Sequence, residues 1–175
     1  MIKADTKEIA DLARSLQKTA RDVPAAFEQV AQRVAKQTGP VAVDEITAIY
    51  GLSEKRAQSA ISTRAQGPVI FTVAKSRGVT LKEFGGEKYA KGYRAQIKRG
   101  KFRNVRGGFT AKAKFTGDLP FKRVGKSRYP IKVLYGPKVS SMIRNREVAP
   151  RFAVRQAGIA RTELTRQMLG KLDRM

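Results

Sequence analysis

The sequence contains no cysteine and no histidine, and acidic residues are scarce. Without cysteine there is no disulfide and no thiol nucleophile, and without either residue the usual zinc ligand sets are missing. The absence of histidine also removes the commonest general base of enzymes. The 14 Asp and Glu residues form no evident cluster for metal-assisted hydrolysis. We therefore expect a protein that is not an enzyme and that binds no metal and no cofactor.

Long hydrophobic segments are also missing. The longest apolar run is PVIFTVA at residues 68–74, which is far too short to span a bilayer. The first twelve residues, MIKADTKEIADL, have no apolar core of the kind that a secretion signal needs. We expect a soluble protein without membrane contacts, made in a reducing compartment such as the cytoplasm.

Positive charge is what the sequence has in excess. It holds 37 Lys and Arg residues against 14 Asp and Glu, a net charge of +23. A field of this size attracts polyanions and makes their binding dependent on salt. Residues 87–128 alone hold 14 Lys and Arg against 2 Asp and Glu, a net of +12. The partner class that this charge predicts is nucleic acid or an acidic protein.

The hydrophobic period changes twice along the chain. It is helical over residues 1–60, with an interruption at Gly39-Pro40, and it alternates with period two over residues 61–136. From residue 137 it is helical again, with the following apolar stripe expected to pack: Ala153, Ala157, Ala160, Leu164, Met168 and Leu172. This order predicts one α+β domain over residues 1–175, with N-terminal helices, a central antiparallel β-sheet and a C-terminal helix.

Residues 87–118 stand apart within the predicted sheet. The stretch KRGKFRNVRGGFTAKAKFTGD has isolated apolar residues, four glycines and many cations, so it predicts a long, flexible basic arm that orders against a partner. Charge density alone selects the candidate residues that face nucleic acid, which are Arg94, Lys98, Arg99, Lys101, Arg103 and Arg106.

Three phenylalanines lie in or near this arm: Phe102, Phe109 and Phe115. Aromatic side chains between cations are typical of platforms that stack single-stranded bases. Their spacing of seven and six residues does not follow strand alternation, however. We favour the alternative that they anchor the arm on a neighbouring subunit.

The stretch DEITAIYGLSEKRAQSAI, residues 44–61, has features of a helix-turn-helix. Gly51 suits the turn, but Thr47 is larger than the small residue that the first helix needs, and Ala57 is too small to fill the core. We favour a structural corner. A winged-helix regulator or an RNA-associated factor stays the alternative function.

The stretch RYPIKVLYGPKVSSMI, residues 128–143, is the most distinctive. Its Arg-x-Pro-Ile strand and Leu-x-Gly-Pro turn resemble the hallmark segment of the phage minor tail protein Z family. A Tyr-x-Leu-Ser element and a Leu-Lys-x-Phe segment precede it in the same order as in that family. The matching residues are Tyr50, Leu52, Ser53, Leu81, Phe84, Arg128, Pro130, Ile131, Leu134, Gly136 and Pro137.

This resemblance implies a structural virion protein of a tailed phage or prophage. Such proteins complete the tail at its head-proximal end, or neck, and support head–tail joining. The resemblance further implies a homo-oligomeric ring around the DNA channel, in contact with adjoining tail-terminator or tail-tube and head-connector proteins. The corresponding location is the tail or neck of the virion, after assembly in the host cytoplasm.

Overall fold

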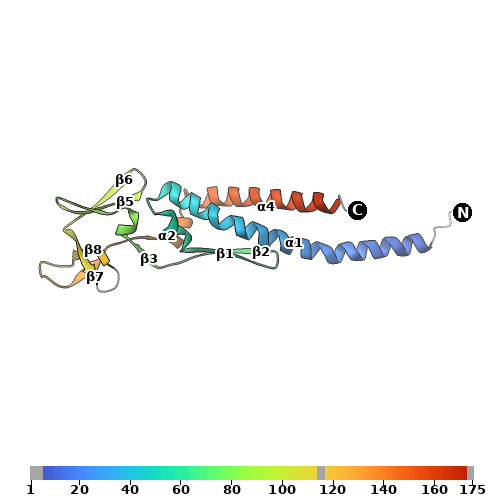
Figure 1. The fold of residues 1–175 in the computed structure, drawn as a ribbon, viewed down its shortest axis with the longest axis horizontal. Coiled ribbons are helices and arrows are strands. Elements are labelled where there is room, and N and C mark those ends of the chain that lie inside the picture. Colours follow the sequence, from blue (N-terminus) through green and yellow to red (C-terminus); the bar gives the residue numbers. More distant parts are fainter. Residues whose placement is uncertain (1–5, 114–116, 173–175) are drawn as a thin grey trace.

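A computed structural model describes residues 6–113 and 117–172, and it places the side chains of residues 24–112 and 117–170. The molecule is elongated, with two long helices at one end and short strands at the other (Figure 1). Helices and antiparallel strands occur in the order that the sequence predicts, so the α+β class is confirmed.

Helix α1 spans Thr6–Ile49 without interruption. The predicted break at Gly39-Pro40 is wrong, although a proline inside a helix costs about 3 kcal/mol. Packing on both sides of the proline offsets this cost, because Val34 and Ala42 are almost completely buried. The buried Thr38 hydroxyl also donates a hydrogen bond of 2.8 Å to the Val34 carbonyl. Tertiary contacts therefore override the local signal.

Helix α4, Ala149–Leu172, follows the short helix α3, Val139–Ile143, and lies beside α1 (Figure 1). The apolar stripe predicted to pack is largely outside this contact, since Ala153, Ala157 and Met168 are exposed. The side chain of Leu172 lies outside the described residues. Polar side chains make this contact instead. Arg155 Nη1 of α4 lies 2.9 Å from Glu45 Oε1 of α1.

A hairpin of β1, Ile61–Gln66, and β2, Val69–Ala74, runs along α1 (Figure 1). The Thr63 hydroxyl ties it to the helix with a hydrogen bond of 2.7 Å to the Ala35 carbonyl. Strand alternation leaves Val69, Phe71 and Val73 exposed on the outer face, as the sequence pattern predicts for residues that share one face.

The remaining strands form three small antiparallel sheets at the other end. Strand β3, Gly78–Thr80, pairs with β10, Tyr135–Lys138. A second sheet orders β4, Glu87–Tyr89, β5, Gly92–Lys98, and β6, Lys101–Arg106. The third orders β7, Gly108–Ala113, β8, Gly117–Arg123, and β9, Ile131–Val133. The strand region is thus divided among four sheets, including the β1–β2 hairpin, rather than forming one.

The basic segment 87–118 differs from the flexible arm that the sequence predicts. Its described residues form β-strands, and Tyr93 and Ala95 of β5 belong to the hydrophobic core. Burial of these two side chains ties the segment to the core, which the isolated apolar residues after β5 do not do. Gly100 and Gly107, both with positive φ, allow the tight turns on either side of β6.

The core lies where the C-terminal end of α1 meets the short strands. Its buried residues come from α1, the 3-10 helix Leu81–Phe84, β5 and α3, and include Ile46, Leu81, Phe84, Tyr93 and Met142. The segments that the family resemblance spans therefore share one core.

Candidate nucleic-acid interface

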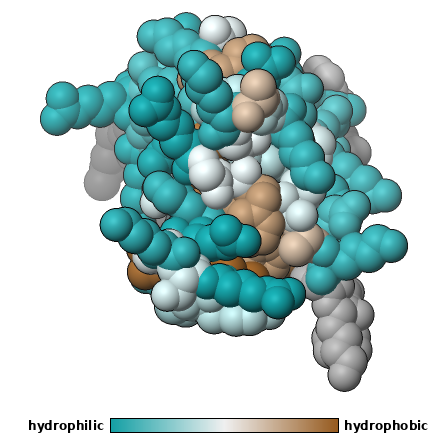
Figure 2. All heavy atoms as spheres, turned by 90° about the vertical axis from the view of Figure 1, so that its left-hand side faces the viewer, coloured by the Kyte–Doolittle hydropathy of each residue, from teal (hydrophilic) through white to brown (hydrophobic). Residues whose placement is uncertain are grey.

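The end of the molecule that holds the short strands, called the strand end below, carries most of the clustered positive charge. Strands β4–β8 fall within residues 87–128, the segment with a net charge of +12. Figure 2 looks onto this end and shows hydrophilic residues around a band of hydrophobic ones. The six candidate residues all lie on β5, β6 and the turns beside them, so the structure brings them to the same end of the molecule.

Arg94 is held within the chain. Its Nη2 lies 2.7 Å from Glu87 Oε1, on the neighbouring strand β4. Its guanidinium also lies over the Phe102 ring, 5.0 Å from the ring centroid. Such a cation–π contact fixes the side chain. Arg94 therefore links strands β4, β5 and β6, and Glu87 partly neutralises its charge within the chain.

Arg99 serves the C-terminal end of α1. Its Nε donates a hydrogen bond of 2.6 Å to the Thr47 carbonyl, and its backbone N–H donates one of 2.9 Å to the Ile49 carbonyl. The last carbonyls of a helix lack intrahelical partners and carry partial negative charge. Since the last turn of α1 contains no basic residue, Arg99 supplies that cation from the sheet.

Lys98 is also paired, with its Nζ 2.8 Å from Glu147 Oε1. The hydrogen bond from Lys98 lowers the pKa of Glu147, and the same bond raises the pKa of Lys98. The pair links β5 to the loop before α4. Three of the six candidates, Arg94, Lys98 and Arg99, thus have structural partners.

The Lys98–Glu147 pair gives a dependence of stability on pH. A carboxylate with a lowered pKa stabilises the fold above its ordinary pKa of about 4.3 and loses that contribution as pH falls through its folded value. We expect the melting temperature of wild type to exceed that of Glu147→Gln at pH 7, and the difference to shrink as pH falls below about 4. Thermal melts from pH 3 to 7 measure it.

Glu54→Gln is the matched control, because Glu54 is an exposed carboxylate whose side chain accepts a hydrogen bond from the neutral Gln58 amide. Replacing it removes a carboxylate that is bonded to a neutral amide, so Glu54→Gln should lower the melting temperature at pH 7 less than Glu147→Gln does. A Glu147→Gln difference that does not change with pH would contradict the role given to the pair.

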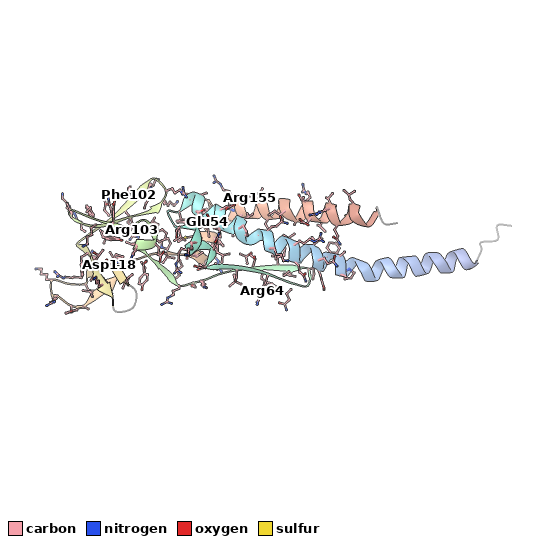
Figure 3. All side chains as sticks on the ribbon, viewed as in Figure 1. Glu54, Arg64, Phe102, Arg103, Asp118 and Arg155 are labelled. Carbon is pink, nitrogen blue, oxygen red and sulfur yellow. The ribbon has the colours of Figure 1, made fainter. Side chains whose placement is uncertain are left out.

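The other three candidates, Lys101, Arg103 and Arg106 of β6, are exposed. The strand register sets Arg103 opposite Ala95 and Arg106 opposite Gly92, and alternation then places these two side chains on opposite faces of the sheet. Figure 3 shows Phe102 and Arg103 projecting from β6 at the tip. These cations surround a strand edge and do not line one groove, which suits contact with phosphates and not the reading of bases.

The aromatic residues do not form one platform. Phe102 lies under Arg94, whereas Phe109 stacks with Phe121 of β8 at a centroid distance of 6.1 Å. Phe115 lies outside the described residues. The two described phenylalanines therefore belong to different sheets, each with a partner from its own sheet.

The residues of the family resemblance are mostly structural. Tyr50, Leu52, Leu81 and Phe84 are buried, and Leu134 accepts a hydrogen bond of 3.0 Å from the Leu81 N–H. A side chain on Gly136 would lie 2.5 Å from the Phe84 ring, so this position needs glycine. The set that completes the resemblance is less buried: Ser53, Arg128, Pro130, Ile131 and Pro137.

The stretch that resembles a helix-turn-helix is a corner packed on β5. The Gly51 N–H donates a hydrogen bond of 3.1 Å to the Ile97 carbonyl, and a side chain at Gly51 would overlap the Gln96 carbonyl oxygen. The following helix, α2, spans only Glu54–Gln58. A helix of five residues so close to a strand is too short to act as a recognition helix.

Sequence reasoning missed the polar contact between α1 and α4. Glu163 of α4 is buried and accepts a hydrogen bond of 2.9 Å from Gln37, and Arg33 lies 3.9 Å away. The predicted apolar stripe lies largely outside the contact between α4 and α1. The available signal was the spacing of Phe152, Ile159 and Glu163, but a pattern that mixes apolar and charged residues does not identify a buried face.

No family model, no curated protein and no solved structure matches this chain. Within residues 6–113 and 117–172, no helix is long and apolar enough to cross a membrane. The same residues contain no group of three or more acidic side chains, Cys or His that is placed to hold a metal ion.

Proposed function

We propose that this chain is a structural protein of a tailed phage or prophage, which completes the tail and joins it to the head. The observation that carries the proposal is the sequence resemblance of residues 128–143 to the minor tail protein Z family. In its favour, Leu81, Phe84, Leu134 and Gly136 meet in one packed corner, although they come from separate segments of the chain. A chance match of short motifs would not require that meeting.

The distribution of charge suits a ring around passing DNA. Exposed cations such as Arg103 and Arg106 stand at one end of an elongated molecule, and its two long helices form the other end (Figure 1). Copies arranged side by side through their helical ends would present a collar of cations without base-specific contacts. The helical end offers exposed apolar residues for such contacts, among them Phe71, Val154 and Met168.

The proposal is tested by locating the chain in assembled particles. A phage or prophage carrying this gene with a small peptide tag at either chain end is purified, and the tag is detected by labelled antibody in electron micrographs. We expect label at the head–tail junction, and we expect particles made without the gene to separate into heads and tails. Joined, infectious particles that lack the chain would refute the proposal.

A basic nucleic-acid-binding protein stays the second candidate, and the net charge of +23 is the observation that favours it. It predicts tight binding of the single chain to a preferred sequence, at about 10⁻⁸ M or below in physiological salt. Binding of unrelated duplexes with equal affinity would oppose this candidate.

A further inference from the structure

The sheet β7–β8–β9 has two chemically different faces. The register aligns Phe109 with Phe121 and Phe121 with Val133, and it aligns Ala111 with Leu119 and Arg123 with Ile131. Because side chains alternate along a strand, all of these residues share one face. We call its six apolar members the apolar tip face: Phe109, Ala111, Leu119, Phe121, Ile131 and Val133.

The opposite face is the one that packs on the protein. Pro120 is buried there, and a side chain at Gly108 would meet the Tyr93 side chain of the core. The Pro120 carbonyl accepts a hydrogen bond of 2.8 Å from the Leu134 N–H, next to the core. The sheet is therefore anchored through one side, which leaves the apolar tip face turned away from the core.

The apolar tip face is not part of the hydrophobic core. None of its six residues belongs to the core cluster or to the partly buried residues packed against that cluster. All six are only partly buried. A three-stranded sheet gains stability when its apolar face is covered. The hydrophobic core does not supply that cover, and each of the six side chains keeps part of its surface exposed.

One cation lies over the apolar tip face, and two more follow in the loop after β8. Arg123 lies over the Phe109 ring, 5.6 Å from its centroid, and Lys126 and Arg128 are exposed in the loop that follows β8. Two large apolar or aromatic side chains of the same loop are also exposed, Val124 at 53% and Tyr129 at 66%. A hydrophobic centre with a charged rim is the usual composition of a protein–protein interface. The rim here is positive, so the complementary partner is negative.

A second copy of this chain does not supply that negative charge. Its acidic side chains are few, and intrachain ion pairs already engage several of them: Asp44, Glu45, Glu83, Glu87, Glu147 and Glu163. Two copies meeting at this rim would place like charges together, which costs several kcal/mol.

A stacked nucleic acid also fits poorly. A base needs an open aromatic face, but Phe109 and Phe121 stack on each other and Arg123 covers part of Phe109. The rest of the apolar tip face is aliphatic, with Leu119, Ile131 and Val133, and offers no ring for further bases. Cations beside aliphatic side chains favour an acidic polypeptide.

We propose that the apolar tip face docks an extended, acidic and amphipathic segment of an adjoining protein, which sets apolar side chains on the sheet and carboxylates on the rim. The proposal deepens the proposed function, on which it rests for placing that protein in the phage neck. It separates two roles at the strand end: β6 cations face DNA, and the β7–β8–β9 sheet faces protein.

The probe is a ten-residue synthetic peptide in which Glu alternates with Val, so that an extended strand has one acidic and one apolar face. The comparison peptide has the same composition with five Glu followed by five Val. Calorimetric titration of the full chain should show the alternating peptide binding about tenfold more tightly, which corresponds to about 1.4 kcal/mol. Phe109→Ser with Phe121→Ser should abolish this preference.

The control variant is Phe71→Ser with Val73→Ser, which removes exposed apolar side chains from the β1–β2 hairpin. It should keep the preference for the alternating peptide. A second test variant, Leu119→Lys, adds positive charge but interrupts the apolar tip face. We expect it to weaken binding of the alternating peptide, whereas attraction by charge alone would strengthen it.

Three results would overturn the proposal. The first is equal affinity for the two peptides, and the second is stronger binding of the alternating peptide by Leu119→Lys. The third is that the Phe109 and Phe121 changes weaken binding of a twelve-residue oligothymidine but not binding of the peptide. The last would assign the face to single-stranded nucleic acid. None of these measurements depends on particle assembly. A particle without the chain at its neck would refute the proposed function and leave the peptide result standing.

Discussion

Replacing Phe84 with alanine is expected to lower the free energy of unfolding by about 3–5 kcal/mol. Phe84 is completely buried in the 3-10 helix Leu81–Phe84, and Gly136 of β10 lies directly against its ring. The substitution loses the transfer free energy of the ring and leaves a cavity between two segments about fifty residues apart in the sequence. Urea denaturation followed by circular dichroism measures the change.

Phe102→Ala is the matched control, since it removes the same side chain from a position that is 53% exposed. Loss of the contact with Arg94 should cost about 1 kcal/mol or less. Equal losses for the two variants would show that Phe84 is not the packed centre that the structure describes.

The contact between Phe84 and Gly136 can be tested separately with a double-mutant cycle. Gly136→Ala should destabilise wild type, because its Cβ would lie 2.5 Å from Phe84 Cε2. In a Phe84→Leu background the ring edge is gone, and the same substitution should cost less by about 1 kcal/mol or more. Additive effects would mean that the two residues do not touch.

The sequence pattern was sufficient for the order of elements and for faces where alternation is strict. Val69, Phe71 and Val73 alternate with less exposed residues and share the outer face of the β1–β2 hairpin. The pattern failed where long-range packing decides. Pro40 does not break α1 because buried neighbours hold the helix, and α4 contacts α1 through Arg155 and Glu163, which no apolar pattern marks.

In the candidate site, too, some features follow from the sequence pattern and others only from long-range packing. Charge density selected residues that the structure brings to one end of the molecule, since all six cations lie at the strand end. It did not distinguish exposed cations from paired ones, because the partners are distant in the sequence. Arg99 reaches Thr47, 52 residues earlier, and Lys98 reaches Glu147, 49 residues later. Only the fold brings these groups together, so Lys101, Arg103 and Arg106 emerge as the available cations only from the structure.

Replacing Lys101, Arg103 and Arg106 together with glutamine is expected to weaken binding to random-sequence duplex DNA on the order of a hundredfold at 0.1 M salt. Each phosphate contact contributes about 0.9 to the slope of log affinity against log salt, so the slope should become shallower by about 2.7. The three side chains are exposed on β6 and carry no core contact, so the fold should survive. Fluorescence anisotropy over a salt series measures the slope.

The control removes the same charge from the helical end, with Lys36, Arg161 and Arg166 replaced by glutamine, all three exposed on α1 or α4. If DNA passes beside the strand end, this variant lowers affinity a little through the general field and leaves the slope nearly unchanged. If net charge alone governs binding, both variants lose the same affinity, and the strand end has no special role. Contact with a passing DNA backbone therefore predicts that only the β6 substitutions change the salt slope. It also predicts that they do so equally for every duplex sequence.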